Sequence, residues 1–192
     1  KDISSNLSTL NAEGWTLFTS KDYVQSKKKF QEAIVASLVS SIYDSVSNEA
    51  INGRGWSSLF AQETSSAATV AYNDFFSINA NTVSISNKSK FDALAGLAIS
   101  GVLIKNQNED VFYLNVVIAA ESLLNDSPNY ELSYNTKINY KDVRYSLVQA
   151  HFNLSNFRSA ADHLDILDPV NAPHSASPED LLNSIQSLAG QL

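Results

Sequence analysis

The chain has 192 residues, with 13 Lys and Arg against 20 Asp and Glu and a formal net charge of −7, and it contains neither cysteine nor methionine. That length allows one ordinary domain with a real hydrophobic core, and the lack of cysteine excludes disulfides, thiolate metal sites and a cysteine nucleophile. The acidic balance argues against nucleic-acid binding, which requires a basic face, and the sequence has no stretch of about 18 apolar residues that could span a bilayer.

Apolar residues recur at helical spacing along nearly the whole chain, beginning with a helix pair at approximately residues 7–36. The break at residues 20–22 is so short that the two helices of this pair must pack antiparallel. Their apolar faces consist of Leu7, Leu10, Gly14, Leu17 and Phe18 in the first helix and Tyr23, Ser26, Phe30, Ala33 and Ile34 in the second.

A second pair at approximately residues 47–78 repeats features of the first. Gly14-Trp15 returns as Gly55-Trp56 after 41 residues, and at a shift of 42 residues Phe30 corresponds to Tyr72. Self-similarity with a period between 20 and 50 residues is typical of stacked structural repeats. The sequence therefore predicts repeated helix pairs rather than an irregular bundle.

Two further pairs are expected at approximately residues 89–125 and 139–168. Gly96 in the third pair lies 41 residues after Gly55, and Asn139 is a suitable N-cap for the fourth pair, with Asp142 three residues later. We expect one all-α domain covering residues 1–192, with the linker at 77–89 separating the first two pairs from the last two.

A final helix is predicted at approximately residues 178–190. Ser177-Pro178-Glu179-Asp180 supplies an N-cap, a proline in the first turn and acidic residues at the positive end of the helix dipole. Because an open end of a helical stack exposes apolar surface, this helix is expected to cap the last repeat. Its apolar side consists of Leu181, Leu182, Ile185 and Leu188.

These residues resemble the tetratricopeptide repeat (TPR). The matching positions are Gly14, Tyr23, Ser26, Phe30 and Ala33 in the first repeat, Phe157, Ala160, Leu164 and Leu167 in the fourth, and Asp168-Pro169 at its end. The resemblance implies a right-handed solenoid of about four antiparallel helix pairs, whose first helices line a concave groove. The longer spacing of 41 residues is accounted for by long linkers between the helices.

Three segments are similar to a family of bacterial TPR lipoproteins. They are Asn52-Gly53-Arg54-Gly55-Trp56, Asp92-Ala93-Leu94-Ala95-Gly96-Leu97-Ala98 and Asn139-Tyr140-Lys141-Asp142-Val143-Arg144. This resemblance implies an extracytoplasmic location, periplasmic or at the outer membrane, with a possible lipidated cysteine upstream of Lys1.

In a TPR stack, Trp15 and Trp56 would both face the concave groove, together with residues one turn away on the same helices and comparable positions in the fourth repeat. Large aromatic residues are common energetic anchors of interfaces. The alternative is that the two indoles pack one repeat against the next. The predicted partner-binding groove consists of Asn11, Trp15, Phe18, Asn52, Trp56, Leu59, Tyr145, Gln149 and Phe152.

His151 and His163 lie on successive helices of the fourth repeat, near Asp162, Asp165 and Asp168. A metal or hydrolytic site is conceivable there. However, the chain has no HExxH, GxSxG or phosphate-binding loop motif, so we expect no metal, no cofactor and no catalytic residue. His151 is expected to replace the aromatic residue that the repeat places between its helices.

The function predicted from these observations is a non-catalytic scaffold that binds a protein partner in its groove. The alternative is a carbohydrate- or small-ligand-binding lipoprotein that uses Trp15 and Trp56 as stacking platforms. A hydrolase using His151 or His163 is a third hypothesis, which the missing motifs argue against.

Overall fold

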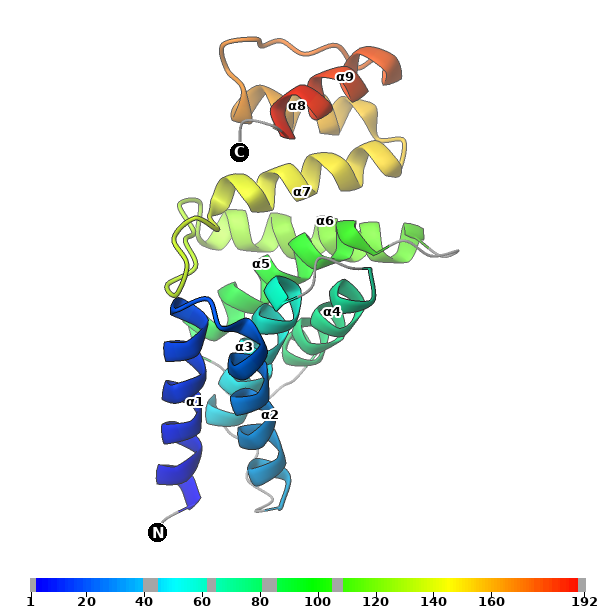
Figure 1. Ribbon diagram of the computed structural model, residues 1–192. Helices are drawn as coiled ribbons and strands as arrows, with labels where there is room; N and C mark the ends of the chain where they lie inside the picture. Colours follow the sequence, from blue (N-terminus) through cyan, green and yellow to red (C-terminus); the bar gives the residue numbers. More distant parts are fainter. Residues whose placement is uncertain (1–2, 40–44, 62–64, 81–85, 105–108, 190–192) are drawn as a thin grey trace.

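The computed structural model describes residues 3–39, 45–61, 65–80, 86–104 and 109–189 (Figure 1). Within these residues the fold is all-α, and the only β-type pairing is an isolated bridge between Glu131 and Asn139. The helices are α1 (Ile3–Thr19), α2 (Tyr23–Val39), α3 (Ser45–Ala61), α4 (Ser65–Asn79), α5 (Asn87–Leu103), α6 (Glu109–Asp126), α7 (Tyr140–Asn153), α8 (Phe157–Leu167) and α9 (Pro178–Ala189). In the described part of the chain, no helix is both long and apolar enough to cross a membrane.

Each helix packs against the next one along the chain, and the odd-numbered helices also contact one another in sequence from α1 to α9. Figure 1 shows the helices arranged in chain order, from α1 and α2 at one end to α8 and α9 at the other. The predicted pairs correspond to α1–α2, α3–α4, α5–α6 and α7–α8, and the predicted capping helix is α9. The expectation of an all-α fold with consecutive helix packing is therefore confirmed.

The apolar core is divided into two clusters that meet at α7. The first cluster extends from Leu7 on α1 to Ala150 on α7, and the second joins Val148 of α7 to α8 and α9. The division expected at the linker 77–89 is wrong, because α4 packs directly on α5 and the first cluster continues across both helices. Residues 81–85 of that linker lie outside the described residues.

Two phenylalanine rings are each held between two glycines of neighbouring helices. Phe30 on α2 is fully buried against Gly14 of α1 and Gly53 of α3. A Cβ atom added to Gly14 would lie 2.7 Å from a carbon of the Phe30 ring. Because real Cβ atoms do not approach other carbons so closely, only glycine allows these helices to contact the ring.

The same arrangement recurs one pair later around Phe75 of α4. This ring is fully buried against Gly55 of α3 and Gly96 of α5, and a Cβ on Gly55 would lie 2.8 Å from it. Phe30 therefore corresponds to Phe75, 45 residues later. The sequence-based correspondence of Phe30 with Tyr72 is wrong by about one helical turn, because the linkers inside the repeats differ in length.

Arg54 lies between the two glycines of α3 and points to α4. Its Nε donates to Oδ2 of Asp74 at 2.9 Å, and its Nη1 donates to Gln31 of α2 at 2.6 Å. Burial raises the pKa of Asp74, while the charge and hydrogen bonds of Arg54 lower it. Arg54 thus links the two helices that flank α3.

We predict that Gly53→Ala destabilises the protein by about 1–3 kcal/mol, because the added methyl group overpacks the Phe30 ring. Without that contact, the same change would stabilise a helix interior by about 1 kcal/mol. Urea unfolding followed by circular dichroism measures the difference. In a Phe30→Leu background the penalty should shrink, and a stabilising effect of Gly53→Ala in the wild-type background would refute the packing argument.

Candidate functional site

Most of the predicted groove residues are buried in the core rather than exposed on a groove. On α1, Asn11, Trp15 and Phe18 are all buried. On α3, Asn52 and Trp56 are buried, and Leu59 is half-buried against the same core. This part of the inner surface is therefore mostly structural.

The three predicted groove residues on α7 are half-buried and lie near α9. Tyr145 and Phe152 pack against the second apolar cluster, and the Tyr145 hydroxyl donates to the backbone carbonyl of Ile185 at 3.1 Å. Gln149 is also half-buried. The terminal helix thus occupies the face of α7 on which the sequence placed a partner.

Trp56 is fully enclosed, with 0% of its surface exposed. Its ring packs edge-on against Phe75, with ring centroids 5.3 Å apart. Its indole Nε1 has no hydrogen-bond partner among the described residues. The expectation that Trp56 faces an open groove is therefore not met, because the glycine contacts of Phe75 draw α3 and α4 closely together.

Trp15 is 4% exposed but borders an open pocket of about 420 Å³. Its Nε1 donates to Oε1 of Glu49 at 3.2 Å, and the ring of Tyr134 stacks on it with centroids 3.8 Å apart and an interplanar angle of 8°. The pocket is lined by Ser8, Asn11, Ala12, Trp15, Thr16, Thr19, Val46, Glu49 and Tyr134.

Neither indole presents an open face for stacking on a sugar ring. Tyr134 covers one face of Trp15, and Phe18 and Phe30 pack edge-on against the indole with centroids 5.4 and 5.0 Å away. Trp56 is enclosed completely. The two stacking platforms required by the carbohydrate hypothesis are therefore absent from the described structure.

The segment between α6 and α7 forms one wall of this pocket, which the sequence did not indicate. It leads from α6 towards one end of α1 in Figure 1 and brings Tyr134 onto Trp15. The segment is anchored by the fully buried Leu132 and by Tyr130, whose hydroxyl donates to Oδ1 of Asp92 at 2.8 Å. Linker composition alone predicted only its length.

Charged groups surround Tyr134. The Nζ atom of Lys88 lies 4.0 Å from the centre of the Tyr134 ring, a cation–π geometry, and the Tyr134 hydroxyl lies 3.5 Å from Oε1 of Glu49. Burial raises the pKa of Asp92 to about 6, although the hydrogen bond from Tyr130 and the charge of Lys88 lower it.

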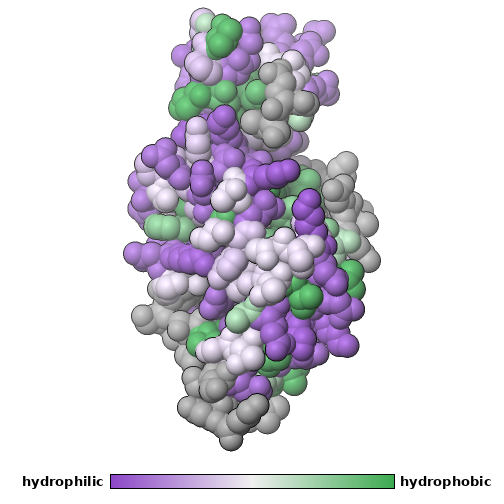
Figure 2. Space-filling model, turned by 60° about the vertical axis from the view of Figure 1, so that its left-hand side comes forward, coloured by the Kyte–Doolittle hydropathy of each residue, from purple (hydrophilic) through white to green (hydrophobic). Residues whose placement is uncertain are grey.

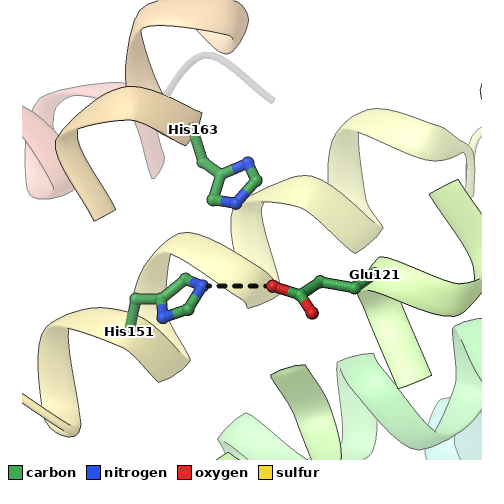
Figure 3. Close-up of side chains that lie close together, drawn as sticks. All are labelled: Glu121, His151 and His163. Atoms are coloured by element: carbon green, nitrogen blue, oxygen red, sulfur yellow. Dashed lines mark ion pairs between the residues drawn. The ribbon is translucent and has the colours of Figure 1, made fainter. Parts of the chain in front are cut away.

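A second cluster joins Glu121 of α6, His151 of α7 and His163 of α8 (Figure 3). Nε2 of His151 lies 3.9 Å from Oε1 of Glu121, and the two imidazole rings are parallel within 7°, with centroids 5.5 Å apart. Nδ1 of His163 is 3.1 Å from Nη1 of Arg144.

Both histidines in this cluster are held in their neutral form near pH 7. Burial lowers the pKa of His151. Burial, reinforced by the nearby charge of Arg144, lowers the pKa of His163 to about 4. Neutral imidazoles retain a nitrogen lone pair, so the cluster can accept a hydrogen bond or coordinate a cation.

The aspartates that the sequence placed near these histidines are used elsewhere. Asp165 accepts hydrogen bonds at 2.7 Å from both the backbone N–H and Nδ1 of His174, and Oδ2 of Asp168 lies 3.5 Å from its Nε2. His174 therefore fastens the segment after α8. Glu121, the carboxylate that does approach His151, belongs to the preceding helix pair, and no local spacing indicates it.

The described residues define an all-α protein of consecutively packed helices. Comparison with known proteins found no matching family model, curated protein or solved structure. The TPR resemblance is thus carried by residues of the sequence itself.

We predict that Tyr134→Ala uncovers Trp15 and increases acrylamide quenching of tryptophan fluorescence, because the stacked ring that excludes solvent is lost. The enclosed Trp56 contributes little to the change. Tyr134→Phe is the matched control, since it keeps the ring. Equal quenching in the Ala variant and the wild type would contradict the observed stacking.

We predict that Asp92→Asn alters the pH dependence of stability. Because Asp92 binds a proton near pH 6 when folded and near pH 4 when unfolded, wild-type stability from this group falls as the pH rises from 4 to 6. The unfolding free energy of the variant relative to wild type should therefore rise by roughly 3 kcal/mol across that range. Urea unfolding at several pH values measures it, with the exposed Glu131→Gln as a control that shows no such trend.

Proposed function

We propose that this chain is a non-catalytic TPR-like solenoid of four helix pairs, capped by α9, that binds a segment of a partner protein. The contacts among odd-numbered helices support this, because stacked repeats place equivalent helices side by side along one surface. The resemblance to bacterial TPR lipoproteins supports an extracytoplasmic location with a lipid anchor.

The observation that carries the proposal is the pocket beside Trp15. Its rim combines a carboxylate, Glu49, with the aromatic ring of Tyr134, a combination that suits a Lys or Arg side chain. Lys88 already places an ammonium group over the same ring, which supports the suitability of the site for a cation.

The surface around the pocket also favours a basic partner. The face shown in Figure 2 is mostly hydrophilic, with hydrophobic residues in small separate areas. The formal net charge of −7 attracts a positively charged segment at long range. We therefore propose that the partner segment is a peptide with at least one basic residue that enters the pocket.

A set of fluorescent synthetic peptides tests this proposal, with basic, neutral and acidic members otherwise matched. We expect fluorescence anisotropy to show a preference for basic peptides, and Glu49→Gln to weaken their binding about tenfold, because the buried charge-assisted contact is lost. Glu179→Gln on α9, far along the chain and exposed, is the matched control. Equal effects of the two substitutions, or no preference for basic peptides, would refute the proposal.

A further inference from the structure

Three side chains able to coordinate a metal converge between consecutive helices α6, α7 and α8. Figure 3 shows Glu121, His151 and His163 pointing towards a common space. We propose that these three residues bind a divalent transition-metal ion of the zinc type, which differs from our expectation from the sequence of no metal.

The spacing of the donors is close to what zinc requires. One potential ligand atom from each residue lies within 4.8 Å of the others. Bonds of about 2.0–2.2 Å in a tetrahedral site place ligand atoms roughly 3.3 Å apart, so the three donors need to close by about 1 Å. Glu121 allows this adjustment, because its side chain is 51% exposed.

The donor set selects the class of metal. Two imidazoles and one carboxylate suit zinc and the neighbouring transition metals, whereas calcium and magnesium require mostly oxygen ligands. Three protein ligands leave a fourth position for water, on the side where Glu121 reaches solvent. The site is therefore of the open type.

Two unsatisfied groups mark the same place. Nδ1 of His151 and Nε of Arg144 are buried and have no hydrogen-bond partner among the described residues. The guanidinium of Arg144 contacts Nδ1 of His163. Coordination through Nε2 of His163 puts the ring proton on Nδ1, which can then no longer accept from Arg144. The metal thus replaces this contact.

The position of the site gives it a structural consequence. Glu121 belongs to α6, which packs in the first apolar cluster, whereas His163 belongs to α8 of the second. A bound metal would connect the two clusters across α7. Hydrogen exchange in α8 and α9 should therefore slow on metal binding, because opening the second cluster would break a metal ligand.

The test uses the full chain, stripped with EDTA, dialysed and titrated with zinc chloride by isothermal calorimetry. We expect one equivalent to bind with micromolar or tighter affinity, and magnesium and calcium chloride to give no heat. Glu121→Gln and His163→Gln should each weaken zinc binding at least tenfold. His174→Gln, which changes the histidine outside the cluster, should leave the affinity unchanged.

Because His151 is buried, its substitution can disturb folding, so the half-exposed Glu121 carries the test, with circular dichroism confirming a folded variant. Zinc should slow amide exchange in α8 of the wild type but not of Glu121→Gln. Binding that is lost in His174→Gln, is unaffected by Glu121→Gln, or is absent from the wild type would overturn the proposal. Peptide binding at the Trp15 pocket is measured separately and does not affect this result.

Discussion

The close contact between a phenylalanine ring and a pair of glycines sets the architecture of the first three helix pairs. Phe30 and Phe75 each project from the second helix of a pair and touch one glycine in their own pair and one in the next. The rings fix both the distance and the register between neighbouring helices, because a side chain at any of these glycines would collide with them. Hydroxyl groups reinforce the first contact, since Ser26 Oγ lies 2.8 Å from the Gly14 carbonyl oxygen and from Ser57 Oγ.

The same constraint explains why the segments that resemble TPR lipoproteins are structural. In the first, Gly53 and Gly55 receive the two rings, and Arg54 pairs with Asp74. In the second, Gly96 receives Phe75. The third contains the capping box of α7, with Asn139 and Asp142 bonded to each other's backbone groups. Resemblance at such positions supports a shared helix arrangement and carries little information about a ligand.

Helix positions could be predicted from the sequence because they depend on local patterns. The apolar periodicity and the short breaks placed α1 to α9 close to their observed bounds, and the cap at Asn139 formed as expected. The register of the repeats was less accessible, since the shift between Phe30 and Phe75 depends on which rings meet glycines in three dimensions.

The candidate sites were the least predictable part, because each joins segments far apart in the chain. Trp15 meets Glu49 and Tyr134, which are 34 and 119 residues away in sequence. His151 and His163 were singled out, but the carboxylate near them is Glu121 of the previous pair. No spacing rule within one helix reports such contacts, and burial of Trp56 follows from packing between pairs rather than from its own helix.

The burial of most inner-surface residues determines what kind of recognition this protein can perform. A continuous open groove would contact a partner along many residues, but here α9 covers part of α7, and Tyr134 covers the face of Trp15. What stays open near Trp15 is a pocket of about 420 Å³, towards the lower end of the range for small-molecule sites. Recognition through one anchored side chain is favoured over recognition along an extended surface. Specificity then rests on the charge of Glu49 and the ring of Tyr134, and the small contact area favours a partner that binds and leaves rapidly.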